Sequence, residues 1–203
     1  PFILIALLIS AVVAGIFGII IGIPALRLRG DYLAIITLGF GEIIRVVLTN
    51  IDSVIGVDFT YGAAGLQRIP KSSSFTLVFI CVVVSCYIIH TIMKSRHGRA
   101  ILSIREDEIA SESSGIRTTY YKTFAFVLSA MLAGIAGCLY AGYLGSLYPS
   151  TFKFMKSIEI LVMVVLGGMG SMLGSVISAS VLTILPELLR SFSDYRMVVY
   201  SLA

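Results

Sequence analysis

Charged side chains are scarce in this sequence: they make up 13% of its 203 residues, whereas hydrophobic residues make up 58%. A soluble globular domain carries about a quarter charged residues, so the composition excludes an ordinary soluble domain. The apolar stretches approach the roughly twenty residues that a helix needs to cross a bilayer. They contain Gly, Pro and Ser and lack the alternating pattern of membrane β-strands. We therefore predict an all-α, polytopic transmembrane helical bundle.

Several kinds of functional site are also missing from the sequence. The only histidines, His90 and His97, lack metal-ligand spacing to cysteines or carboxylates. Neither a G-x-S-x-G elbow nor a G-x-x-x-x-G-K-[ST] phosphate loop occurs. We therefore expect no catalytic residue, no metal site and no directly bound cofactor. The cysteines lie in apolar stretches, where buried reduced thiols are expected: Cys81, Cys86 and Cys138.

The basic residues indicate the membrane topology. The net charge of +4 does not predict a nucleic-acid partner, because these residues flank the apolar stretches. The positive-inside rule places residues 94–118 in the cytoplasm, residues 50–74 and 145–157 outside, and Arg27 with Arg29 inside. Arg190 and Arg196 fit this arrangement less well, so the topology after residue 158 stays open. The cluster that sets the orientation is Lys94, Arg96, Arg99, Arg105, Arg117 and Lys122.

Four apolar stretches are predicted as membrane spans: residues 2–26, 32–49, 75–93 and 120–144. The stretch 158–189 exceeds one span and is broken by "GGMGS", so we expect two segments, the first of them short. Residue 1 is Pro, and apolar runs are cut at both ends, so we expect a single membrane domain over 1–203, truncated at both ends. Small residues recur at the spacing that lets helices approach closely, at Ala14, Gly18, Gly22, Ala130, Gly134, Cys138, Gly142, Ala133, Gly137 and Ala141.

One predicted span contains an ionisable pair. Glu42 and Arg45 are three residues apart, so they share a helix face and can form an ion pair. An ionisable residue inside a span is costly and is a functional-site hypothesis. The pair is either structural, with Arg45 reaching toward headgroups, or part of a translocation path. In the second case Gly39 and Gly41 would allow close packing or a bend.

The glycine-rich break in the last apolar stretch also has two interpretations. Gly167, Gly168 and Gly170 can form a tight turn or a close helix contact. Alternatively, a broken helix presents backbone dipoles to a substrate near the bilayer midplane, as in many transporters. Both interpretations can hold together.

The most polar passage is "SRHGRAILSIREDEIASESSGI", residues 95–116. It is too short to be a domain, and we predict a short helix with flexible joints at Gly98 and Gly115. Ile101, Ile104 and Ile109 would share part of one face. From periodicity alone, a solvated connector, a helix on the membrane surface and a docking element all stay open.

This passage resembles the cytoplasmic coupling loop of branched-chain amino-acid ABC transporter permeases of the LivM type. Three further stretches match the same family in the same order: "RGDYLAIITLGFGEIIRVVLTN" (29–50), "GAAGL" followed by "IP", and "SIEILVMVVLGGMGSMLGSVISA" (157–179). The resemblance covers about residues 27 to 200. Several long motifs in register are a specific signal.

The resemblance implies a permease subunit of an ABC importer in the bacterial or archaeal cytoplasmic (inner) membrane. It would form the path for leucine, isoleucine or valine with a second homologous permease subunit, in contact with membrane lipid. An extracytoplasmic amino-acid-binding protein would deliver the solute, and separate ABC ATPase subunits would hold ATP and Mg. Alternatives are a related permease for urea, ribose or nucleosides, an ion-coupled secondary carrier and, without a visible catalytic cluster, a membrane enzyme.

The resemblance also assigns the polar passage to ATPase coupling. The three isoleucines would be apolar anchors, and the acidic run would orient the ATPase through complementary charge. The residues expected to take part are Gly98, Arg99, Ile101, Ile104, Arg105, Glu106, Asp107, Glu108, Ile109 and Gly115.

Overall fold

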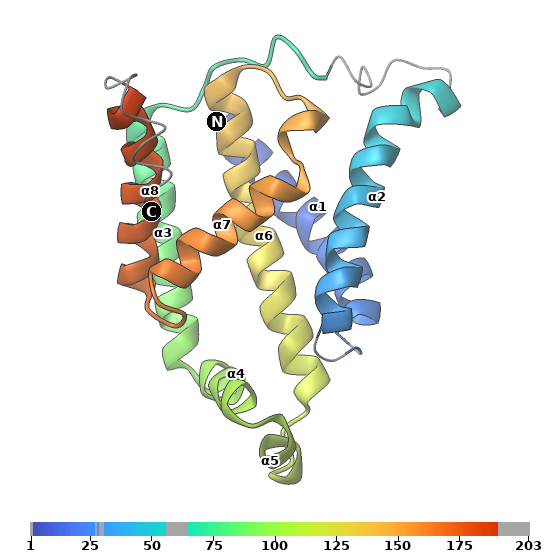
Figure 1. Cartoon of the computed structure of the whole chain (residues 1–203), viewed down its shortest axis with the longest axis vertical. Helices are drawn as coiled ribbons and strands as arrows, with labels where there is room; N and C mark the ends of the chain where they lie inside the picture. The colour runs from blue at the N-terminus through green and yellow to red at the C-terminus, as the bar shows by residue number, and fades with distance from the viewer. Residues whose placement is uncertain (1, 27, 29–30, 56–64, 191–203) are drawn as a thin grey trace. The chain divides into compact units, whose positions relative to one another are not determined.

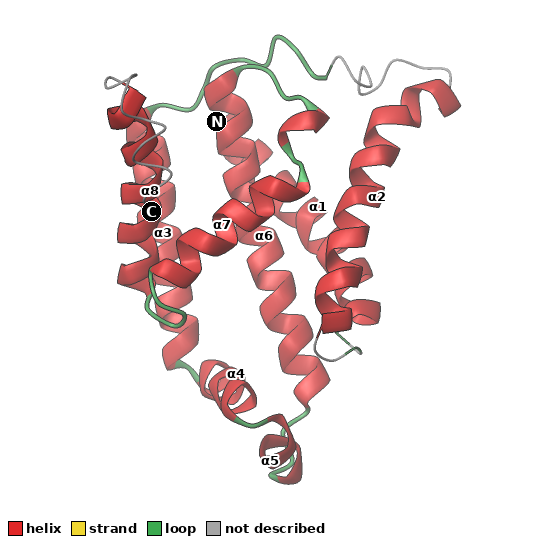
Figure 2. Ribbon diagram, in the orientation of Figure 1, coloured by secondary structure: helices red, strands yellow, loops and turns green. Residues whose placement is uncertain are grey.

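The computed structural model of the chain describes residues 2–26, 28, 31–55 and 65–190 (Figures 1 and 2). Within these ranges the backbone is helical apart from turns, connections and one isolated antiparallel bridge, Leu66 with Leu147. The predicted all-α class is therefore confirmed. The chain divides into two compact units, residues 1–151 and 152–203. The single membrane domain stays a prediction.

Three helices of the described part are long and apolar enough to cross a membrane: α1 (Phe2–Ala25), α3 (Phe75–Lys94) and α6 (Thr118–Leu144). They confirm the helices predicted at 2–26, 75–93 and 120–144. Most large apolar side chains on them are exposed on the isolated chain. Such a surface is stable in hydrocarbon and not in water, so this is a multi-pass membrane protein.

The helix α2 (Asp31–Ile55) contains the two glycines for which close packing or a bend was predicted. Gly39 and Gly41 lie inside continuous helix, and a Cβ at either position would meet no described atom within 4 Å. A single glycine costs a helix only about 1 kcal/mol, which the apolar residues around it offset. Because α2 runs to Ile55, residues 50–55 of the predicted outer loop are helical. That α2 crosses the membrane stays a prediction.

The predicted stripes of small residues bring α1 and α6 together. A Cβ on Gly18 would lie 2.8 Å from the Cβ of Ala130, and one on Gly134 would lie 2.6 Å from the Cβ of Ala14. Only glycine allows the two backbones to approach this closely. Early residues of α1 meet late residues of α6, so the helices are antiparallel. The end of α1 therefore lies beside the start of α6.

The two segments predicted to lie outside the membrane meet at the other end of the first unit. The Leu66 N–H donates to the Leu147 carbonyl (2.9 Å), and the Leu147 N–H donates back to Leu66 (2.8 Å). Close by, the Ile69 N–H donates to the carbonyl of Gly145 (3.0 Å), and the Ser73 hydroxyl donates to that of Leu139 (2.9 Å). The fold thus places residues 65–73 beside residues 139–147 at one end of the first unit. The side of the membrane on which they lie stays a prediction.

The polar passage forms two short helices, α4 (Arg96–Glu106) and α5 (Glu108–Ser113), and lies between the end of α3 and the start of α6 (Figure 1). The prediction of one short helix is therefore wrong. α4 ends at Glu106, because the backbone of Asp107 is extended. Asp107 is also the N-cap of α5. We refer to residues 95–116 as the α4–α5 segment.

The described residues of the second unit form two helices, and their separation confirms the predicted break. α7 (Phe154–Leu166) and α8 (Met172–Arg190) are separated at residues 167–171. Gly168 and Gly170 have φ of +89° and +98°, which favours glycine. At 1.5 Å per residue α7 is about 20 Å long, shorter than the hydrocarbon core. The loop predicted at 145–157 is shorter than expected: it contains a 3-10 turn, η2 (Pro149–Thr151), and α7 begins at Phe154.

Candidate functional site

The α4–α5 segment begins in a tight turn after α3. Ser95 caps both helices: its hydroxyl donates to the Ile92 carbonyl (2.6 Å) and accepts from the Gly98 N–H (3.3 Å). A Cβ on Gly98 would collide with backbone atoms of Ile92 and Met93. Gly98 is buried inside the first turn of α4. It is therefore a point of close backbone contact and not the flexible joint that was predicted.

Asp107 creates the break between α4 and α5. Its backbone is extended (φ −152°, ψ 112°), and its carboxylate accepts from the N–H groups of Ile109 (2.8 Å) and Ala110 (3.0 Å). A carboxylate at this position satisfies free N–H groups and interacts favourably with the positive end of the helix dipole. The side chain of Asp107 is thus used within its own chain.

Gly115 ends α5 with a left-handed residue. Its φ is +81°, its N–H donates to the Glu112 carbonyl (3.0 Å), and the Ile116 N–H donates to Ser111 (3.1 Å). This is the usual helix ending that requires glycine. Gly115 therefore sets the direction in which the chain leaves α5 for α6.

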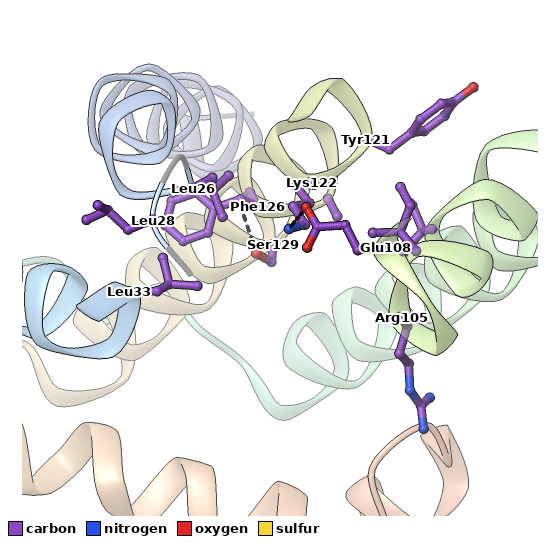
Figure 3. Close-up of a pocket in the computed structure, with 12 residues that line it drawn as sticks. Leu26, Leu28, Leu33, Arg105, Glu108, Tyr121, Lys122, Phe126 and Ser129 are labelled. Atoms are coloured by element: carbon purple, nitrogen blue, oxygen red, sulfur yellow. Dashed lines mark hydrogen bonds and ion pairs between the residues drawn. The ribbon is translucent and has the colours of Figure 1, made fainter. Parts of the chain in front are cut away.

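An aromatic contact and an ion pair join the segment to α6. The ring of His97 lies 5.8 Å from those of Tyr121 and Phe124, measured between centroids. The Nζ of Lys122 lies 2.6 Å from a carboxylate oxygen of Glu108 (Figure 3). Neither His97 nor Lys122 was among the predicted site residues. In the sequence, Lys122 counts only among the basic residues that set the membrane orientation, because nothing local in the sequence links it to Glu108.

A pocket of about 520 Å³ lies between this segment and the ends of α1, α2 and α6 (Figure 3). Its wall is mostly apolar, and the Glu108–Lys122 pair lies beside it. Arg105 also lines the pocket but points away from the pair (Figure 3). The lining residues are Leu26, Leu28, Leu33, Ile101, Ile104, Arg105, Glu108, Tyr121, Lys122, Ala125, Phe126 and Ser129.

The three isoleucines predicted to share a face have different surroundings. Ile104 is 9% exposed and Ile101 is half-buried, and both line the pocket. Ile109, beyond the break, is 70% exposed, so the prediction of a shared face is wrong for this residue. Leu102, which sequence reasoning did not single out, is 38% exposed. The apolar side chains open to a partner are therefore Leu102 and Ile109.

The charged residues of the segment also differ in exposure. Arg99, Arg105 and Glu106 are exposed. Glu108 is half-buried in its pair with Lys122. The structure brings the predicted coupling residues together in one element, and their role in coupling stays a prediction.

The predicted pairing of Glu42 and Arg45 is confirmed. Arg45 Nε donates to the carboxylate of Glu42 at 3.0 Å, within a single helix. Gly39 and Gly41 lie on the same helix in the first unit, whereas Gly167, Gly168 and Gly170 lie in the second. A translocation path through these residues stays a prediction.

The described helices define a membrane protein with several apolar helices and one polar element between two of them. Over residues 1–202 the chain matches the family described as branched-chain amino acid transport system / permease component, and it belongs to this family. The predicted family is therefore confirmed. No solved structure matches the chain.

Individual relatives agree with this assignment. The chain is 37% identical to the high-affinity branched-chain amino acid transport system permease protein LivM of Salmonella typhimurium and to that of Escherichia coli, over 94% of the chain and 52% of each relative. It is 33% identical to LivH of E. coli, over 52% of the chain and 34% of LivH. The fructose import permease protein FrcC of Rhizobium meliloti is 24% identical over 71% of the chain and 44% of its own length. The chain spans about half the length of the LivM relatives.

Proposed function

We propose that the chain is part of the permease subunit of an ATP-driven importer for leucine, isoleucine and valine. The family match and the names of the LivM relatives support this reading. The protein would lie in a bacterial or archaeal cytoplasmic membrane and form the path with a second, homologous permease. The partial match to LivH supports such a partner. An extracytoplasmic binding protein would deliver the amino acid.

The observation that carries the proposal is the position of the α4–α5 segment. It lies at the end of the first unit opposite the contact between Leu66 and Leu147 (Figure 1), and the Glu108–Lys122 pair and the ring contacts of His97 join it to α6. A permease whose sequence lacks a phosphate-binding loop needs energy from a partner or an ion gradient. A short ordered element that carries exposed charge and apolar groups is suited to bind an ATPase with its ATP and Mg.

The surface of the segment indicates which residues would contact the ATPase. Ile109 and Leu102 supply exposed apolar groups, and Glu106 and Arg99 supply exposed charge on the same segment. Apolar groups that become buried on binding contribute most of the affinity, whereas charge sets orientation. We assign the docking contact to these four residues and place Ile104 on the inner side of the element.

A sugar is the second candidate substrate. The match to FrcC, a fructose import permease, favours it over urea or a nucleoside. The importer architecture would be the same, and only the delivered solute would differ.

The test is reconstitution of the full-length permease with its second permease, ATPase subunits and binding protein in proteoliposomes. We expect uptake of radiolabelled leucine that needs both ATP and the binding protein. Fructose uptake under the same conditions would favour the second candidate. Leucine uptake driven by an ion gradient without ATP would contradict the proposal in favour of a secondary carrier.

A further inference from the structure

An ion pair between Glu108 and Lys122 joins the α4–α5 segment to α6. We propose that these two are positioning residues: they hold α5 on the start of α6, so that a displacement of α5 by the ATPase moves α6. The part of this inference that concerns transport rests on the proposed function. The part that concerns the position of α5 does not.

The electrostatics of α6 give the pair a physical reason. α6 begins after Arg117 without a side-chain cap and has no acidic residue in its first turn. Lys122 is the fifth residue of α6, beyond the first turn in which the helix dipole acts, so the direct attraction between the two charges stabilises the pair. Glu108 supplies the acid from α5. The side chains of Lys122 and Glu108 are 26% and 29% exposed, so the pair is screened less than one on an open surface.

The three adjacent acids of the segment therefore have separate tasks. Asp107 caps α5 through two backbone N–H groups, and Glu108 binds α6. Glu106 is exposed and is the one placed to meet a partner. This division replaces the expectation that all three acids orient the ATPase.

The position of Glu108 in the chain connects the partner-facing side of α5 to the membrane helices. Ile109, the most exposed isoleucine of the segment, directly follows Glu108. A partner that binds Ile109 therefore displaces a residue adjacent to the ion pair. Lys122 belongs to α6, which packs along α1 through Gly18 and Gly134. Movement of α5 would reach the membrane helices by this route.

The first test measures the position of α5 without any partner. A spin label at Ser113, in full-length protein whose native cysteines are replaced, reports the mobility of α5. We expect Glu108→Lys and Lys122→Glu each to raise the mobile fraction about fivefold, because each places like charges together; such a change corresponds to about 1 kcal/mol of coupling. The double exchange should restore the wild-type spectrum.

A matched control uses another ion pair. Lys156 and Glu159 are 2.8 Å apart within α7 and are both exposed, so K156Q/E159Q should leave the spectrum unchanged. Unchanged mobility in Glu108→Lys and Lys122→Glu would overturn the inference. The inference would also be overturned if the double exchange left α5 as mobile as either single variant does.

The second test measures transport in the reconstituted importer. We expect Glu108→Lys to lower the amount of substrate carried per ATP about fivefold, while the permease still co-purifies with the ATPase, and Lys122→Glu in the same chain to restore it. Loss of co-purification without rescue by Lys122→Glu would mean that Glu108 contacts the ATPase directly and would overturn the inference. A wild-type importer that carries nothing would instead refute the proposed function, and the spin-label result would still decide the ion pair.

Discussion

Asp107 illustrates at the scale of one residue how an exposed acid can serve its own chain. Its carboxylate accepts two backbone N–H groups at the start of α5. Asp and Asn are about equally good at this position, whereas Ala is poor. A partner that recognised the negative charge would distinguish Asp from Asn. The two roles can therefore be separated by substitution.

We expect Asp107→Ala to destabilise α5 by about 1 kcal/mol and Asp107→Asn to have little effect. Hydrogen exchange at the Ile109 and Ala110 amides measures this directly, with an expected fivefold to tenfold loss of protection in the Ala variant. Equal defects of both variants in ATPase association, with exchange unchanged, would show instead that the charge of Asp107 is read by the partner.

At the scale of whole elements, hydrophobic length was sufficient to predict α1, α3 and α6. Each is an apolar run of spanning length, so its existence follows from the cost of placing backbone groups in a bilayer. The sequence could not predict the division of the α4–α5 segment, because residues around Asp107 favour helix and only the cap geometry interrupts it. Nor could it pair Glu108 with Lys122, which belong to different helices.

The packing face of α6 was likewise ambiguous in the sequence. Both stripes of small residues, one through Gly134 and one through Gly137, have the spacing of a close helix contact. The structure distinguishes them. A Cβ on Gly134 would lie 2.6 Å from the Cβ of Ala14, whereas one on Gly137 would meet no described atom within 4 Å.

This difference predicts opposite effects of the same substitution in α6. Gly134→Ala should destabilise the protein by about 1–3 kcal/mol, because α1 must move away. Gly137→Ala should be neutral or stabilise by up to about 1 kcal/mol, since alanine favours a helix. Thermal unfolding of the full-length protein in detergent compares them. A greater loss of stability in Gly137→Ala than in Gly134→Ala would show that α1 contacts the stripe through Gly137 and would contradict the structure.

At the scale of the molecule, the charge pattern and the fold can be compared for the described parts of the connecting segments. Basic residues predict that residues 94–118 lie in the cytoplasm and that residues 50–74 and 145–157 lie outside. Separately, the fold joins Leu66 to Leu147 at one end of the first unit and places the α4–α5 segment at the other. Backbone geometry shows that the ends differ, and only the charge indicates which end is cytoplasmic.

This arrangement predicts a labelling pattern for three exposed serines of the first unit. Cysteines at Ser72 and Ser150, in a background without native cysteines, should react in intact cells with a reagent that cannot cross the membrane, and one at Ser113 should react only after permeabilisation. Ser72 and Ser150 serve as controls for each other, because they flank the contact between Leu66 and Leu147. The reverse pattern would keep the fold and invert the orientation. Labelling of Ser72 and Ser150 from opposite sides would contradict the fold itself, since no membrane can separate segments joined by backbone hydrogen bonds.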